Sequence, residues 1–226
     1  KDVCEWHTRP EYLEHSLSVL DRLAARYCSH VALHAIEVLN EPRWDVPTDY
    51  LKGFYRAAYA QIRRHCDADR VAIVFHDGFR SHVEYLGFMQ GPEYQNVLFD
   101  IHRYQCFVRE DIDMDIHGHM RKAAGEWKSE ADAIITELPY PTICGEWSLG
   151  LDLKVVSLWA AGPFNHALER MDGFQESVAY RGYAAAQLAT FEKYQGWFFW
   201  SYKTETTPAW CFRDCVERGW LPAFFG

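Results

Sequence analysis

The sequence predicts an α/β fold built around a parallel sheet, and three observations support this prediction. Strand-like and helix-like segments alternate along all 226 residues. The strand-like segments are continuous apolar runs, as in sheets that helices cover on both faces. The chain contains no linker, low-complexity tract or short repeat that would divide it. We therefore expect residues 1–226 to form part of a single domain.

Each helix is predicted from its residue pattern. The first covers residues 11–28, where leucines such as Leu13, Leu17 and Leu20 recur at helical spacing. The second covers residues 47–66, and we expect Thr48 to cap its first turn. A short helix near 81–88, a polar helix at about 114–135 and a helix near 177–194, after a loop rich in Gly, Pro and Asn, follow. The apolar strand-like runs between them are residues 32–39, 70–75, 97–104, 141–147 and 196–202.

Five strands, each followed by turn or helix residues, suggest part of a (β/α)8 TIM barrel. One strand–helix unit takes about 45 residues here, so eight units would need roughly 360, which lies within the range of such barrels. The chain is too short for eight. We therefore expect it to supply about strands 4–8, with the three N-terminal strands missing.

Composition restricts the possible partners. The net charge of −9 disfavours nucleic acid, because phosphate binding requires Lys and Arg patches that the sequence lacks. No apolar run is long enough to cross a bilayer, so no membrane association is expected. Aromatic residues make up 16% of the chain, and flat amphipathic rings suit stacking on sugars.

The cysteines predict a cellular location. There are seven, an odd number, with no C-x-x-C spacing, and several lie inside apolar strand runs. This pattern favours buried free thiols in a reducing compartment over a disulfide framework. We therefore expect a cytoplasmic protein. The alternative is a secreted protein whose signal precedes Lys1.

Two short strings place an acid at the end of an apolar run: LNEPRW contains Glu41, and ICGEWS contains Glu146. Strand ends are where α/β proteins usually bind their ligands. Cleavage of a glycosidic bond needs one acid to protonate the leaving oxygen and one carboxylate to meet the oxocarbenium-like carbon. The two glutamates are therefore candidates for that pair of roles, and two acids suffice without a metal or organic cofactor.

The motifs resemble glycoside hydrolase family 5, in particular its exo-β-1,3-glucanase branch. Five strings occur in the family's order and cover nearly the whole chain: LNEP at 39–42, FHDGF at 75–79, HRYQCF at 102–107, GEWS at 145–148 and GWFFWSYKTE at 196–205 with Trp210. The resemblance implies that Glu41 is the acid/base and Glu146 the nucleophile of a retaining enzyme, with carboxyl groups about 5–5.5 Å apart. It also implies sugar contacts by Asn40, His102, Tyr104, Trp200, Phe79 and Phe107.

Structural roles remain open for several of these residues. Asn40 could cap its turn, His102 and Tyr104 could be hydrogen-bonded core groups, and Trp200 could be a packing residue. Phe79 and Phe107, which the resemblance places beside the acceptor sugar, could equally be core or rim packing. His76 beside Asp77 favours a structural hydrogen bond at a strand end over catalysis.

The resemblance implies hydrolysis of β-1,3-linked glucose in an oligosaccharide or short glucoside by double displacement. A sugar acceptor in place of water would make the enzyme a transglycosylase. Relatives that cleave β-1,4-glucans or glycolipids provide one alternative substrate class. A partial barrel that binds sugar without catalysis is the alternative from another functional class. The family's arginine on the second strand and histidine on the third have no counterpart here, and neither do the cysteines that pair in its fungal enzymes.

Overall fold

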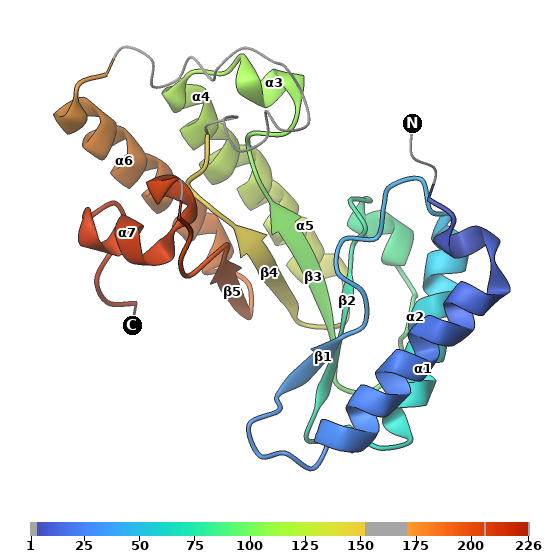
Figure 1. Ribbon diagram of the computed structural model, residues 1–226. Coiled ribbons are helices and arrows are strands. Elements are labelled where there is room, and N and C mark those ends of the chain that lie inside the picture. The colour runs from blue at the N-terminus through green and yellow to red at the C-terminus, as the bar shows by residue number, and fades with distance from the viewer. Residues whose placement is uncertain (1–3, 152–170, 206, 226) are drawn as a thin grey trace. The chain divides into compact units, whose positions relative to one another are not determined.

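The computed structural model describes residues 4–151, 171–205 and 207–225 (Figure 1). Its strands are β1 Ala35–Glu37, β2 Ala72–His76, β3 Val97–Arg103, β4 Thr142–Trp147 and β5 Gly196–Phe199. Its α-helices are α1 Pro10–Tyr27, α2 Thr48–Arg63, α3 Arg109–Ile112, α4 Ile116–Arg121, α5 Trp127–Glu137, α6 Gly173–Phe191 and α7 Phe212–Glu217. Short 3-10 helices occur at Trp6–Thr8, His82–Tyr85 and Pro208–Trp210.

The strands form one sheet in chain order, β1-β2-β3-β4-β5. The β1–β2, β2–β3 and β4–β5 pairs are parallel. His76 of β2 is in register with Asp100 of β3, so the two strands end near the same edge. These pairs confirm the predicted parallel α/β arrangement, with a helix between most consecutive strands.

The chain divides into two compact units, and each is described by itself. Unit 1 comprises Lys1–Ile101 and Thr136–Thr142, and unit 2 comprises His102–Ile135 and Ile143–Gly226. In unit 1, α1 and α2 lie side by side (Figure 1). The core of this unit is aromatic, because the buried Phe75 ring of β2 contacts Tyr85, Phe99 and Tyr140 at centroid distances of 5.5, 5.3 and 5.4 Å. Such tilted and edge-on ring pairs stabilise a core beyond the area that they bury.

A disulfide bridge in unit 1 contradicts part of the cysteine prediction. Cys28, just after α1, is bonded to Cys66, just after α2. The pairing was not evident because the two cysteines are 38 residues apart and become neighbours only when the two helices pack together. Among the described residues, Cys4 and four buried cysteines are not part of a disulfide bridge. The cytoplasmic location itself stays a prediction.

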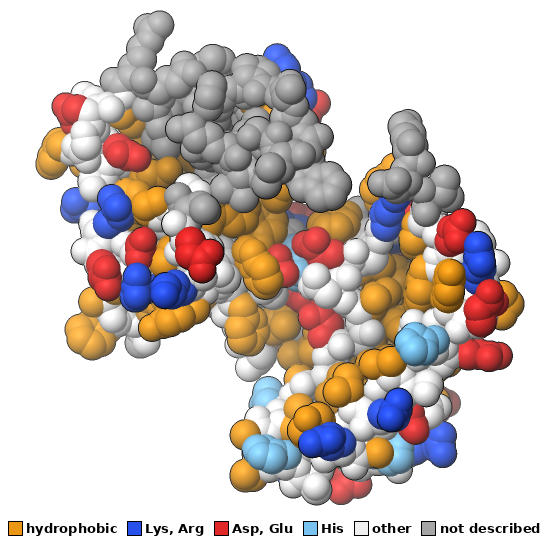
Figure 2. Space-filling view, viewed as in Figure 1, with side chains coloured by type: hydrophobic (Ala, Val, Ile, Leu, Met, Phe, Trp, Pro, Cys, Tyr) orange, Lys and Arg blue, Asp and Glu red, His pale blue; other side chains and the backbone are white. Residues whose placement is uncertain are grey.

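The surface of unit 1 mixes apolar and basic side chains over α1. Val19, Leu23 and Tyr27 are exposed there. Figure 2 shows hydrophobic atoms next to Lys and Arg atoms on this side of the unit. In the part of the chain that the structure describes, no helix has the length and apolar character that a membrane span requires.

In unit 2, α6 packs against α4 and the helical turn that follows α4. Trp147 of β4 contacts Phe191 of α6 and Phe199 of β5 at 5.2 and 5.0 Å, which anchors both elements to β4. The helix predicted at about 114–135 is α4, a π-helical turn Lys122–Glu126 and α5. At this turn the Thr190 hydroxyl donates to the Ala123 carbonyl at 2.7 Å, so α6 satisfies a carbonyl of the irregular segment.

Several predicted element ends differ from the observed ones. Pro47, not Thr48, is the N-cap residue of α2, and the Thr48 hydroxyl instead donates to Glu84 Oε2 at 2.7 Å. Helix α6 begins earlier than predicted because Asp172 and Gln175 form a capping box around its first turn. Strand β1 is shorter than its apolar run. Most of the Gly-, Pro- and Asn-rich loop predicted before α6 lies outside the described residues.

Candidate active site

In unit 1, Glu41 lies on the segment that follows β1. The backbone N–H of Val38 still donates to the Val74 carbonyl at 3.0 Å, so pairing with β2 continues past the end of β1. Glu41 itself has a φ of +42°, a left-handed conformation that is uncommon for residues other than glycine. Pro42 is buried directly behind it. The loop therefore presents Glu41 from a constrained backbone, with Asn40 exposed beside it.

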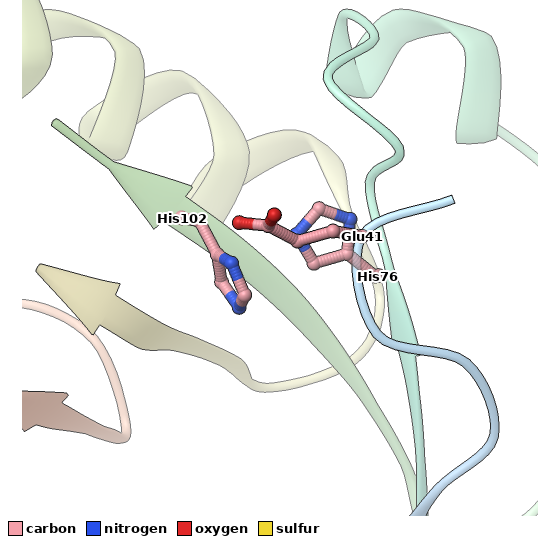
Figure 3. Close-up of side chains that lie close together, drawn as sticks. All are labelled: Glu41, His76 and His102. Atoms are coloured by element: carbon pink, nitrogen blue, oxygen red, sulfur yellow. The ribbon is translucent and has the colours of Figure 1, made fainter. Parts of the chain in front are cut away.

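His76 ends β2 next to Glu41. A carboxylate oxygen of Glu41 and an imidazole nitrogen of His76 lie within 4.8 Å, and Figure 3 shows the two side chains together. His76 is fully buried, and its Nδ1 accepts the backbone N–H of Gly78 at 2.8 Å. In the neutral ring Nε2 then carries the proton. The structural hydrogen bond that we expected for His76 is present, but it involves Gly78, and His76 is also a neighbour of Glu41.

The turn after β2 places Phe79 near the same point. Asp77 Oδ1 accepts the Phe79 N–H at 2.8 Å, and Phe79 has a φ of +60°. The Phe79 ring meets the His76 ring at a centroid distance of 5.3 Å and remains 52% exposed. A ring that is held at its base and open to solvent is suited to contact a ligand.

In unit 2, the Glu146 side chain of β4 contacts two side chains. They are His102 of β3 and Tyr104, which directly follows β3. The Tyr104 hydroxyl donates to Glu146 Oε2 at 2.7 Å, and His102 Nδ1 lies 3.6 Å from the same oxygen. The Glu146 side chain is 14% exposed, whereas His102 is buried. A hydrogen bond donated to a carboxylate favours its charged form. Unit 2 thus holds an oriented carboxylate that is still accessible, which is what a nucleophile requires.

An aromatic cluster surrounds Tyr104. Its ring stacks on Trp210 at 5.3 Å with an interplanar angle of 26°, and Phe107 meets it edge-on at 5.3 Å. A side chain at Gly150 would clash with the Trp210 indole, so only glycine permits this approach. Phe107 is more than half exposed. The cluster therefore supports the Tyr104 hydroxyl on one side and leaves Phe107 open to solvent on the other.

Trp200 directly follows β5, and its backbone pairs with that of Trp147, the residue after Glu146. Its N–H donates to the Trp147 carbonyl at 2.8 Å, and the next N–H, of Ser201, donates to the Trp210 carbonyl at 2.8 Å. The Trp200 indole is 51% exposed. Ser201, the residue after Trp200, thus joins this end of β5 to Trp210, and the Trp200 indole is open to solvent.

The structure gives two residues neighbours at the site that the sequence did not predict. Trp210 stacks on Tyr104, and His76 lies beside Glu41. The only sequence signal for Trp210 was its place after the last motif, because its contact with Tyr104 spans 106 positions.

The sequence is similar to those of fungal enzymes. It is 30% identical over 232 residues to a probable glucan 1,3-β-glucosidase A of Aspergillus niger, and 30% identical over 235 residues to a glucan 1,3-β-glucosidase of Candida oleophila. Each match covers 92% of this chain and 53% of the relative. The chain therefore spans about half the length of these relatives. No family model matches it.

Solved structures establish the fold. The structure of AoRut superposes with a TM-score of 0.68 at 18% identity and covers 96% of this chain and 59% of its own. Endoglucanase Cel5A from the hyperthermophilic Thermotoga maritima gives 0.58 at 15% identity, with coverage of 95% and 69%. The five parallel strands and their helices are those of a (β/α)8 barrel, as predicted. The predicted resemblance to glucan 1,3-β-glucosidases is confirmed as well.

Proposed function

We propose that the protein is a retaining glycoside hydrolase of family 5 that cleaves β-glucosidic bonds, with β-1,3-linked glucose as its substrate class. The observation that carries the proposal is the Glu146 carboxylate at a strand end, oriented by the Tyr104 hydroxyl at 2.7 Å. The names of the fungal relatives support the choice of β-1,3-glucan. The relatives are about twice as long as this chain, so the proposal concerns the full-length protein.

The reaction proceeds in two displacements. In the first, a carboxylate oxygen of Glu146 attacks the anomeric carbon, the bond to the leaving oxygen breaks, and Glu41 gives that oxygen its proton. In the second, the Glu41 carboxylate removes a proton from water, whose oxygen attacks the anomeric carbon and displaces Glu146. The released glucose keeps the β configuration, and both acids return to their starting protonation states.

The side chains around the two acids supply binding. Tyr104 orients Glu146, and its ring is supported by Trp210. The exposed rings of Trp200, Phe79 and Phe107 provide flat surfaces for sugar rings. Asn40 precedes Glu41 in the chain, and His102 Nδ1 lies 3.6 Å from Glu146 Oε2, so we assign both side chains to polar contacts with sugar hydroxyls. The mechanism requires the Glu41 and Glu146 carboxyl groups to lie about 5–5.5 Å apart in the working enzyme.

The test is an assay of the full-length protein on an aryl β-glucoside and on a laminarin-type β-1,3-glucan, with product stereochemistry followed by proton NMR. We expect β-glucose as the first product. Glu146→Gln should abolish turnover, and Glu41→Gln should lower it by about 10²–10⁴-fold on glucan, because proton transfer contributes that much. Binding of glucose oligomers in calorimetry without any turnover would instead support a sugar-binding protein and end the proposal.

A further inference from the structure

The guanidinium group of Arg80 joins two loops of unit 1. Residues 38–47, the Glu41 loop, follow β1, and residues 77–81, the Phe79 loop, follow β2. From within the Phe79 loop, Arg80 Nη1 donates to the Gly78 carbonyl at 2.6 Å. Its Nη2 reaches across to the Glu41 loop, where it donates to the carbonyls of Val46 and, at 3.4 Å, of Trp44. One side chain thus binds backbone oxygens of both loops.

A fourth contact fixes the plane of this group. Arg80 Nε donates to Thr48 Oγ1 at 3.1 Å, and the Thr48 hydroxyl donates its own proton to Glu84 Oε2 at 2.7 Å. Thr48 begins α2, so the guanidinium is anchored to a regular helix as well as to the two loops. A planar group with five N–H donors can make all these bonds at once, which a lysine ammonium cannot do.

Gly78 shows how closely the two loops pass. A Cβ atom at Gly78 would clash with the Arg80 guanidinium and lie 3.3 Å from Cγ of Pro42, the residue after Glu41. Gly78 has a φ of +61°, so glycine is needed there for its conformation as well as for its size. The Arg80 side chain therefore lies over Gly78 with Pro42 within contact distance of the same point.

Both loops contain strained residues that the surroundings must hold. Glu41 and Phe79 have φ values of +42° and +60°, and neither is a glycine. Such conformations persist only where neighbouring contacts fix them, and they gather at functional sites. Arg80 binds the carbonyl of Val46, five residues after Glu41 in the sequence, and the carbonyl of Gly78, the residue before Phe79.

We propose that Arg80 is a positioning residue that holds the Glu41 loop against the Phe79 loop, so that Glu41 keeps the orientation in which it protonates the leaving oxygen. The proposal rests on the proposed function, because it assigns to Glu41 the role of acid. A displacement of about 1 Å at a reacting group can cost about 100-fold in rate. Loss of Arg80 should therefore impair the steps that need Glu41 and spare those that do not.

The experiment compares kcat/KM of the full-length protein on two substrates. A β-1,3-linked glucose disaccharide has a poor leaving group that must be protonated. The 2,4-dinitrophenolate of 2,4-dinitrophenyl β-glucoside departs without protonation. For Arg80→Gln we expect kcat/KM to fall about 10- to 100-fold on the disaccharide and less than about threefold on the dinitrophenyl glucoside. Azide, which attacks without a general base, should restore part of kcat on the dinitrophenyl substrate. Arg80→Lys should recover only a small part of the loss.

The matched control is Arg63→Gln. Arg63 also binds backbone carbonyls, those of Val71 at 2.8 Å and Gln95 at 2.9 Å, but at the amino-terminal ends of β2 and β3. Arg63→Gln should lower the free energy of unfolding. Any loss of kcat/KM in this variant should be the same on both substrates. If Arg80→Gln does not fold, Thr48→Val removes one acceptor of the same group and should give a leaving-group-dependent loss of about two- to tenfold.

Several results would overturn the inference. They are an equal loss on both substrates for Arg80→Gln, full recovery with Arg80→Lys, and no leaving-group dependence for Thr48→Val. The proposed function fails separately, through absence of turnover in the unchanged protein or a Glu41→Gln variant whose loss is the same on both substrates. A leaving-group effect in Glu41→Gln that is absent from the Arg80 variants would leave the proposed function intact and reject only the role of Arg80.

Discussion

Removal of the Tyr104 hydroxyl tests how Glu146 is kept ready to attack. The hydroxyl donates to Glu146 Oε2 at 2.7 Å, and the carboxylate is only 14% exposed. A hydrogen bond to a charged group of this kind contributes about 1.5–3 kcal/mol. Since 1.36 kcal/mol corresponds to one pH unit, Tyr104→Phe should move the acidic limb of the kcat/KM profile up by about one to two pH units. Well below that limb, kcat/KM should fall by about 10- to 150-fold.

The assay is the pH dependence of aryl β-glucoside hydrolysis by the full-length protein. The phenyl ring of the variant still stacks on Trp210, so the plateau rate should change less than the acidic limb. Tyr12→Phe is the control, because Tyr12 lies on the exposed face of α1. An acidic limb that stays in place in Tyr104→Phe would show that this hydrogen bond does not favour the charged form of Glu146.

Three further outcomes are expected. Joint replacement of Cys28 and Cys66 by serine should lower the free energy of unfolding by about 4 kcal/mol in urea titrations, since the bridge closes a 38-residue loop; an unchanged midpoint would contradict this. Burial lowers the pKa of His119 from 6.5 to about 4, so the unfolded chain binds more protons between these values. The contribution of His119 to stability is full above about pH 6.5 and falls by up to about 3 kcal/mol towards pH 4, so His119→Gln should make pH-dependent unfolding curves less steep over that range. Gly150→Ala should force the Trp210 ring away and cost about 1–3 kcal/mol in thermal unfolding, whereas an unchanged melting temperature would show that the ring can yield freely.

The sequence predicted the strands and the positions of the two glutamates because these depend on local pattern. The apolar runs of β2, β3 and β4 were recognisable by themselves, and Glu146 lies one residue before the end of β4. The length of β1 was not, because it depends on pairing with β2 rather than on apolar character.

Contacts between distant residues escaped prediction. The Cys28–Cys66 bridge depends on the packing of two helices, and the stack of Trp210 on Tyr104 joins the end of β3 to a segment after β5. Arg80 was missed for another reason. Its partners are mainly backbone carbonyls, which every residue carries and which leave no mark in a sequence.

In the proposed mechanism, Glu146 becomes covalently bonded to the sugar during turnover. The most direct measurement uses 2,4-dinitrophenyl 2-deoxy-2-fluoro-β-glucoside, whose fluorine slows both displacements while its leaving group speeds the first. Peptide mass spectrometry of the inactivated full-length protein should find one fluoroglucosyl group on Glu146. A label on any other residue, or steady turnover without a trapped sugar, would contradict the assignment of Glu146 as the nucleophile.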